Sequence, residues 1–113
     1  MPITNEQLAG HAFLRSMYED PYFPDHVVDR GRAILLRLCE RIEAAQPPDL
    51  QALYALTQVA TGEFNLLEAE FEAAGSEIET VARESIAEEF RLVATAYGFT
   101  DADTEELIAG RDW

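Results

Sequence analysis

Prolines and glycines divide this chain into segments whose apolar residues recur at helical spacing. Proline stands at positions 21, 24, 47 and 48, and glycine at positions 75 and 98. Proline lacks the backbone N–H that a helix needs, and glycine is common just beyond a helix end. These positions therefore predict helices over about residues 4–19, 25–46, 49–74, 76–97 and 104–109.

The apolar residues within these segments form the stripes of amphipathic helices. The widest stripe lies in the second segment, at Val27, Val28, Ile34, Leu35, Leu38 and Ile42. No run alternates apolar and polar residues as a strand does, and connections of about 2–8 residues favour antiparallel helices. We therefore predict an all-α fold, one domain over residues 1–113, built as a bundle of four main helices plus a short C-terminal helix.

Helix-capping residues stand near the start of each segment. Thr4 with Gln7, and Ser76 with Glu79, have the spacing of capping boxes. An aspartate precedes or opens each remaining segment, and it is predicted to accept a hydrogen bond from an unpaired N–H of the first turn. These aspartates are Asp25, Asp49 and either Asp101 or Asp103.

The charge distribution excludes one large class of ligand. The 113 residues carry a net charge of -14, with 22 acidic and 8 basic side chains. Between Arg41 and Arg83 there is no basic residue, whereas the interval holds eight carboxylates: Glu43, Asp49, Glu63, Glu68, Glu70, Glu72, Glu77 and Glu79. Such a surface repels phosphate backbones and attracts cations, so we expect a basic protein partner and no nucleic acid.

The arginines of the second segment lie along one border of its apolar stripe. Arg30, Arg37 and Arg41 project within about 40° of one another at about 100° per residue. They either meet an anionic neighbouring helix or form a solvated flank whose stems cover apolar surface.

The sequence also bears on compartment and cofactors. Cys39 is the one cysteine, no apolar run is long enough to cross a membrane, and the N-terminus lacks a basic start followed by an apolar stretch. We therefore expect a cytoplasmic protein without a membrane span. Phosphate-binding glycine loops, redox cysteine pairs and Glu-x-x-His metal motifs are absent, so no cofactor, metal or catalytic residue is predicted.

Two polar residues project into the apolar stripe of the fourth segment. Ser85 and Glu89 fall between Ile78, Ala82, Ile86 and Val93. A buried carboxylate needs a partner, and Arg30 or Arg37 are the candidates. Glu89 is then either a structural ion pair or a buried acid that takes part in proton transfer.

A polar band runs beside the apolar face of the third segment. Its members are Thr57, Thr61, Asn65, Glu68 and Glu72. They either line a small polar pocket or form the edge of the core. The pairs Glu68–Glu72 and Glu84–Glu88 share a helix face at four-residue spacing. Each pair either shares a hard cation weakly or consists of two adjacent exposed glutamates.

Aromatic and titratable side chains are densest near the first turn between helices. His11, Arg15 and Tyr18 share a helix face, and Tyr22, Phe23 and His26 follow closely. Together with Arg30, and with Glu79 and Arg83, they are candidates for a ligand pocket, because histidine titrates near neutral pH and tyrosine offers both a ring and a hydroxyl. The alternative is an aromatic plug at the end of the bundle.

Three stretches carry a family resemblance. They are Tyr18-Glu19-Asp20-Pro21-Tyr22-Phe23-Pro24, the run from Ser76 to Glu84, and the end from Glu105 to Trp113. With them the chain resembles the uncharacterised bacterial family known as domain of unknown function 5713, over nearly its whole length. The resemblance implies a bacterial cytoplasmic setting and a stand-alone domain, and it transfers no activity, ligand or site residue.

Two main functional hypotheses follow. The first is a non-catalytic protein-binding or regulatory module, similar in charge to small acidic antitoxins or immunity proteins, that docks a basic partner. The alternative is a small-ligand binder or enzyme with a polar pocket near the Tyr18–His26 turn. The protein is a monomer, or a homodimer that buries Tyr54, Phe99 or Trp113.

Overall fold

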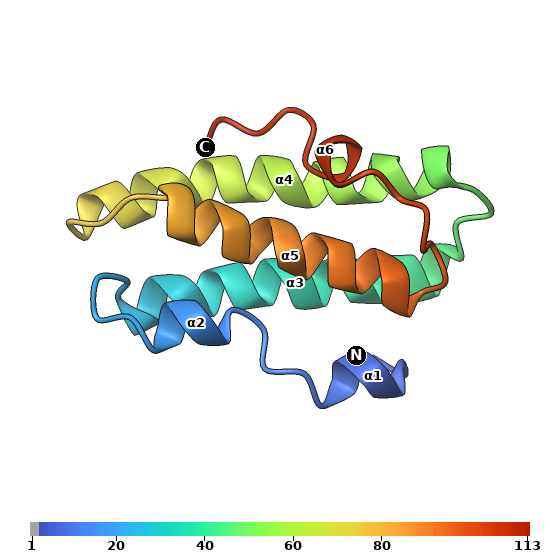
Figure 1. Cartoon of the computed structure of the whole chain (residues 1–113), viewed down its shortest axis with the longest axis horizontal. Coiled ribbons are helices and arrows are strands. Elements are labelled where there is room, and N and C mark those ends of the chain that lie inside the picture. The colour runs from blue at the N-terminus through green and yellow to red at the C-terminus, as the bar shows by residue number, and fades with distance from the viewer. Residues whose placement is uncertain (1–2) are drawn as a thin grey trace.

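The computed structural model describes residues 3–113, and over that range the chain forms six helices and no strand. Three long helices lie side by side, and three short ones flank them (Figure 1). The predicted all-α class is confirmed, although only three of the four expected main helices form. Their bounds are α1 Glu6–Ala9, α2 Arg15–Tyr18, α3 Asp25–Ala45, α4 Leu50–Ala73, α5 Thr80–Ala96 and α6 Thr104–Leu107.

The core lies between the three long helices. Phe64 and Phe71 from α4, Leu35 and Leu38 from α3, and Phe90 from α5 are all at most 1% exposed. Burying a side chain of this size stabilises the fold by about 1.5–3 kcal/mol. The short elements complete the core with Leu8, Met17 and Leu107.

Gly31 lets α3 approach its neighbours closely. A Cβ atom at this position would lie 3.0 Å from Leu14 Cδ1 and 3.2 Å from Phe64 Cε1. Contacts that short are rarely tolerated in a packed interior. The glycine is therefore part of the packing between α3, α4 and the N-terminal segment.

The predicted first helix is broken in the middle, because residues 10–14 leave the helical path. Leu14 adopts a left-handed conformation with φ of 60°, which is rare for a residue other than glycine. Its N–H donates to Glu89 Oε2 at 2.6 Å. The break thus depends on a carboxylate from α5.

The capping box predicted at Thr4 and Gln7 is also wrong. Asn5 caps α1 by accepting from the Leu8 N–H at 3.2 Å. The Thr4 hydroxyl donates instead to Glu43 Oε1 on α3 at 3.1 Å. The N-terminal residues 1 and 2, part of the predicted domain, lie outside the described range.

Of the three caps predicted at aspartates, two are confirmed and one is wrong. Asp49 and Asp103 cap α4 and α6, accepting from the N–H groups of Ala52 at 2.8 Å and Glu105 at 2.9 Å. Asp25 lies inside the first turn of α3, because Pro24 already occupies the cap position.

The second predicted capping box does not form. The helix α5 begins at Thr80, later than expected, and its cap position is held by Glu79 without a side-chain hydrogen bond. The Ser76 hydroxyl is buried without a hydrogen-bond partner in the described structure.

Candidate functional site

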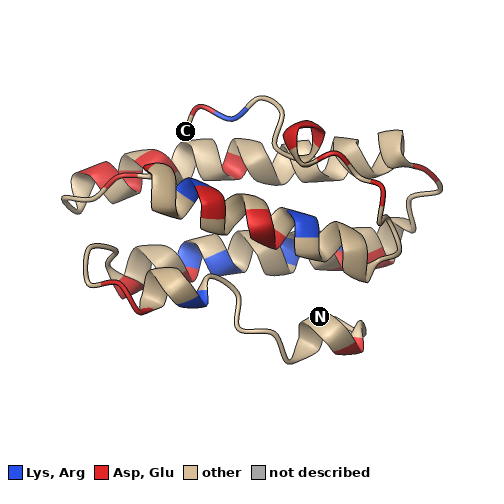
Figure 2. Cartoon of the chain, in the orientation of Figure 1, with Lys and Arg blue, Asp and Glu red and all other residues tan. Residues whose placement is uncertain are grey.

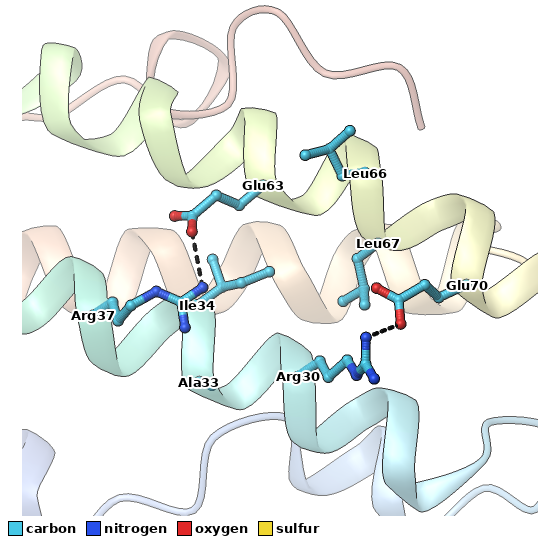
Figure 3. Close-up of a pocket in the computed structure, with 8 residues that line it drawn as sticks. All are labelled: Arg30, Ala33, Ile34, Arg37, Glu63, Leu66, Leu67 and Glu70. Atoms are coloured by element: carbon cyan, nitrogen blue, oxygen red, sulfur yellow. Dashed lines mark hydrogen bonds and ion pairs between the residues drawn. The ribbon is translucent and has the colours of Figure 1, made fainter.

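Arginines of α3 pair with glutamates of α4 along the line where the two helices meet, here called the α3–α4 seam. Glu63 accepts from Arg37 Nη2 at 2.8 Å, and Arg30 pairs with Glu70 (Figure 3). Glu63 also accepts from Arg41 Nη1 at 3.1 Å. A basic edge meeting an anionic helix was one of the two predicted alternatives, and it is the one observed. Because these side chains are partly exposed, each pair contributes only about 0–1 kcal/mol.

The seam encloses a shallow cavity of about 310 Å³. Its walls are the paired ions and the apolar side chains Ala33, Ile34, Leu66 and Leu67. Figure 3 shows Leu67 directed toward α3. Since the charged groups here satisfy one another, the seam has little unbalanced charge to offer a ligand.

Half of the eight carboxylates between Arg41 and Arg83 have partners in the fold. Glu63 and Glu70 pair with arginines, Asp49 caps α4, and Glu43 accepts hydrogen bonds from the N-terminal segment. The other four, Glu68, Glu72, Glu77 and Glu79, make no such pair among residues 3–113. The anionic surface is therefore smaller than the sequence suggests, and it lies toward the C-terminal end of α4 (Figure 2).

Four carboxylates from three segments form what we call the acidic cluster. Glu68 and Glu72 lie on α4, Glu77 on the connection to α5, and Asp112 in the C-terminal tail. Burial raises the pKa of Glu68, and the negative charges of Glu72, Asp112 and Glu77 raise it further, while Arg83 opposes them. A cation bound here would therefore relieve existing repulsion.

Glu89 lies on α5 at the edge of a second cavity. It is 8% exposed, as its inward projection predicts. The predicted partners Arg30 and Arg37 are wrong, because both arginines reach toward α4 in the seam. Instead, His11 Nε2 lies 2.9 Å from Glu89 Oε1, and the Leu14 N–H donates to Oε2.

This second cavity, of about 430 Å³, lies between residues 11–16 and α5 and is called here the His11–Glu89 cavity. The hydroxyl oxygens of Ser16 and Ser85 are 2.8 Å apart at its wall. Glu84 and Glu88 also line it. The cavity thus offers a buried carboxylate, an imidazole and two hydroxyls, which suit a small polar ligand.

The aromatic cluster predicted around Tyr18 and His26 does not gather at this cavity. His11 and Arg15 line it, but the Tyr18 hydroxyl donates to Asp29 Oδ1 at 2.5 Å. Burial and this hydrogen bond raise the pKa of Tyr18 to about 12. Tyr22 is 41% exposed and His26 is exposed. Neither residue lines the seam cavity or the His11–Glu89 cavity.

The remaining members of the predicted pocket also lie apart. Arg30 belongs to the α3–α4 seam, and Arg83 acts on Glu68 in the acidic cluster. The Nε atom of Arg83 is buried without a partner among the described residues. Glu79 is exposed at the start of α5.

The polar band on α4 holds the C-terminal segment instead of lining a pocket. The Thr61 hydroxyl donates to the carbonyls of Thr57 at 3.0 Å and Leu107 at 3.3 Å. Asn65 donates to the Gly110 carbonyl at 3.0 Å and accepts from the Asp112 N–H at 2.9 Å. The alternative that these residues form the edge of the core is the one observed for Thr57, Thr61 and Asn65.

Sequence reasoning missed the role of Glu43. Its carboxylate accepts from the N–H groups of Thr4 and Asn5 and, at 2.5 Å, from the Tyr97 hydroxyl. Burial raises the pKa of Glu43, but these hydrogen bonds outweigh burial and lower the pKa overall. The donors lie 38 to 54 positions away, so no local pattern marks the residue.

Cys39 lies nearby in the core, fully buried. Burial raises the pKa of its thiol to about 12. The thiolate is the reactive form of cysteine, so this side chain is inert packing, as its place in the apolar stripe indicates.

Groups of three or more His, Cys, Asp or Glu side chains able to hold a metal ion do not occur in residues 3–113. In the same part of the chain, no helix is long and apolar enough to cross a membrane. The acidic cluster and the His11–Glu89 cavity each combine charged side chains from separate segments of the chain.

The structure therefore defines a class of protein. It is a small acidic helical protein with a self-paired seam, an acidic cluster and a polar cavity at a break in its N-terminal segment. The chain belongs to DUF5713, a family of unknown function, whose profile matches residues 7–113. This confirms the family resemblance. Comparisons with curated proteins and with solved structures found no match.

Proposed function

We propose that the protein is a non-catalytic docking module that binds a basic protein partner through the acidic cluster. The observation that carries this proposal is that Glu72, Asp112 and Glu77 place negative charge close to Glu68, and Arg83 opposes them. In the α3–α4 seam, by contrast, Glu63 and Glu70 are paired with arginines. A cationic ligand bound at the cluster would reduce the repulsion among these carboxylates.

Such a surface would speed the association of a basic partner as well as strengthen its binding. A net charge of -14 speeds association with a basic partner and disfavours acidic ones. Glu68 contributes more than an exposed carboxylate would, because its charge is partly buried and its pKa already raised. Docking a lysine or arginine side chain beside it would lower that pKa again.

The experiment compares two variants of equal net charge. The cluster variant carries Glu68→Gln, Glu72→Gln and Glu77→Gln. The control carries Glu6→Gln, Asp101→Asn and Glu106→Gln, all exposed positions away from the cluster. Tagged wild type and both variants are used to capture partners from extracts of the source cells at low and at high salt.

We expect a basic protein that the wild type and the control retain at low salt and that high salt releases. The cluster variant should bind it about tenfold more weakly, because three partly screened charge pairs contribute about 0.2–1 kcal/mol each. Equal weakening in the control would mean that overall charge alone matters. That result, or no captured protein at either salt concentration, would overturn the proposal.

A second candidate function is favoured by the His11–Glu89 cavity, where a small polar ligand would meet Glu89, His11 and the Ser16–Ser85 hydroxyl pair. Thermal shift against metabolites and divalent ions tests it, since a ligand that binds only the native state raises Tm. A shift seen in the wild type and lost in Ser85→Ala would support this function. Equal shifts in both proteins, or none, would count against it.

A further inference from the structure

The His11–Glu89 cavity lies between two segments that are distant in the sequence. Figure 1 shows α2 beside α5, and the two helices are in contact. Residues 11–16 form one wall of the cavity, and α5 forms the other. Its volume of about 430 Å³ is within the usual range of small-molecule sites, about 300–1,000 Å³. The chemistry of the two walls can therefore indicate which class of small molecule the cavity would take.

The charged side chains of both walls together carry a negative charge. They are Glu84, Glu88 and Glu89 on α5, and His11 and Arg15 on the opposite wall. When their ion-pair partners Glu19 and Arg91 are included, four carboxylates stand against two guanidinium groups and one imidazole. The total is negative whether or not the imidazole is protonated. An anionic ligand is therefore disfavoured, and a cationic one is favoured.

Glu84 is the carboxylate of this wall whose charge is available to a ligand. It makes no hydrogen bond or ion pair among residues 3–113. Arg15, on the opposite wall, binds Glu19 at 3.2 Å. Glu88 has Arg91 at the longer distance of 3.7 Å, and both of these side chains are more than 60% exposed. A ligand cation would therefore compete with one weak ion pair at Glu88 and with none at Glu84.

The Ser16–Ser85 hydroxyl pair adds hydrogen-bond acceptors to the same cavity. Two hydroxyl groups together hold two O–H donors and four lone pairs. The bond of 2.8 Å between them uses one donor and one lone pair, and neither oxygen has another partner in the described part of the chain. One donor and three lone pairs are left, so the pair can accept more hydrogen bonds than it donates. An ammonium group, which only donates, matches this surplus.

The carboxylates of the cavity are spread along α5 instead of converging on one point. Consistent with this, residues 3–113 contain no group of three or more His, Cys, Asp or Glu side chains that could hold a metal ion. Glu84 and Glu88 are four residues apart, a rise of about 6 Å along one face of the helix. An extended four-carbon chain holds its two terminal nitrogens about 6 Å apart, since it has five bonds of about 1.5 Å. The spacing therefore suits an extended dication better than a single ion.

We propose that the His11–Glu89 cavity binds an aliphatic diamine, a short carbon chain with an ammonium group at each end. The two ammonium groups pair with Glu84 and Glu88, and the Ser16–Ser85 hydroxyl pair accepts a hydrogen bond from one of them. Val81, on the same wall, contacts the methylene groups. This inference names the ligand class for the second candidate function and rests on that function. It is independent of the acidic cluster, which belongs to other segments of the chain.

Isothermal titration calorimetry of the full chain at about 0.1 M salt tests the ligand class. The probes are 1,4-diaminobutane, 1-aminobutane, the neutral analogue 1,4-butanediol, and magnesium chloride. We expect the diamine to bind about fivefold more tightly than the monoamine, because it makes a second ion pair, and the diol to give no binding heat. Equal affinity for the two amines, or tighter binding of magnesium than of the diamine, would overturn the proposal.

A pair of variants with equal net charge tests the site. Glu84→Gln combined with Glu88→Gln removes both carboxylates at exposed positions, and it should weaken diamine binding by about tenfold. The control, Asp101→Asn combined with Glu106→Gln, removes two charges at exposed positions near α6 and should bind as the wild type does. Equal weakening in both would show that the diamine senses only the overall charge, which contradicts a specific cavity.

Backbone amide NMR shifts give the location of the bound diamine. Addition of 1,4-diaminobutane should shift the amides of residues 11–16 and 81–89 and leave those of residues 68–77 in place. Shifts confined to residues 68–77 would place the diamine at the acidic cluster and contradict the assignment to this cavity.

Failure of this inference can be told from failure of the second candidate function. If a neutral or acidic molecule raises Tm in the wild type but not in Ser85→Ala, the cavity binds a ligand and the diamine is the wrong class. If no molecule does so, the diamine included, both the inference and the second candidate function are wrong.

Discussion

The carboxylate of Glu89 replaces a backbone carbonyl. In an unbroken helix the Leu14 N–H would bond the carbonyl of Gly10, four residues earlier. In the structure it donates to Glu89 Oε2, and His11 Nε2 lies against Oε1. A charged acceptor at 2.6 Å makes a stronger hydrogen bond than a neutral one, which helps to offset the left-handed conformation of Leu14.

Removing this acceptor should destabilise the protein. Glu89→Ala leaves the buried Leu14 N–H without a partner, and we expect the free energy of unfolding to fall by about 2 kcal/mol. Urea titration measures the change. The control Glu88→Ala, whose side chain is 70% exposed, should shift the midpoint little. Equal effects at both positions would contradict the role assigned to Glu89.

Because the pKa of Glu43 is lowered in the fold, the free energy of unfolding should depend on pH below the ordinary pKa of a glutamate. Hydrogen bonds from Tyr97, Thr4 and Asn5 outweigh burial and hold its folded-state pKa below the ordinary value of 4.5. A lowered pKa means that the stabilisation is complete above pH 4.5 and is lost as the pH falls through the folded-state pKa.

The measurement is the difference in unfolding free energy between the wild type and Glu43→Gln as the pH is lowered. We expect the wild type to be more stable above pH 4.5 and the difference to shrink below it. A difference that grows with acidity would show that the sign is wrong.

At the scale of elements, packing at Gly31 sets how closely α3 can approach. Gly31→Val adds atoms where a Cβ already lies 3.0 Å from Leu14 and 3.2 Å from Phe64. We expect a loss of about 1–3 kcal/mol from overpacking. Gly62→Ala should instead gain up to about 1 kcal/mol from helix propensity, because a Cβ atom there would meet nothing within 4 Å. Thermal denaturation of both variants checks the opposite signs.

Local sequence patterns were sufficient to predict the three long helices. Pro47 and Pro48 mark the end of α3, and Asp49 caps α4 as expected. The prediction of an unbroken first helix was wrong, because a residue 75 positions from Leu14 accepts the hydrogen bond that stabilises the break. The start of α5 was misplaced because the Ser76 side chain is buried instead of capping.

The candidate sites show the same division between local and distant information. Helical projection correctly places Glu89 in the interior, but it cannot supply the partner, because His11 belongs to a segment whose helix is broken. Projection also groups Asn65 with Glu68 on α4 without revealing the C-terminal tail that Asn65 holds. Facing residues from separate segments are determined by the tertiary fold.

At the scale of the whole molecule, repulsion among the carboxylates should make the thermal stability of the protein rise with salt concentration. At about 0.1 M salt the Debye length is about 10 Å, and at about 1 M it is about 3 Å, so carboxylates of the acidic cluster repel one another less. Screening removes little stabilisation from the ion pairs of the seam, because partly exposed pairs contribute little to stability. We expect Tm to rise with sodium chloride, and to rise less in the Glu68→Gln, Glu72→Gln and Glu77→Gln variant. A falling Tm would contradict this balance.

The hydrogen bond between Leu14 and Glu89 also has a kinetic consequence. It joins positions 75 residues apart, so the N-terminal segment can take its final path only after α5 has docked against α3 and α4. The contacts within the three long helices need no such closure. We therefore expect residues 5–18 to fold last, and their amides to exchange with deuterium before those of α3 while the rest of the protein stays native.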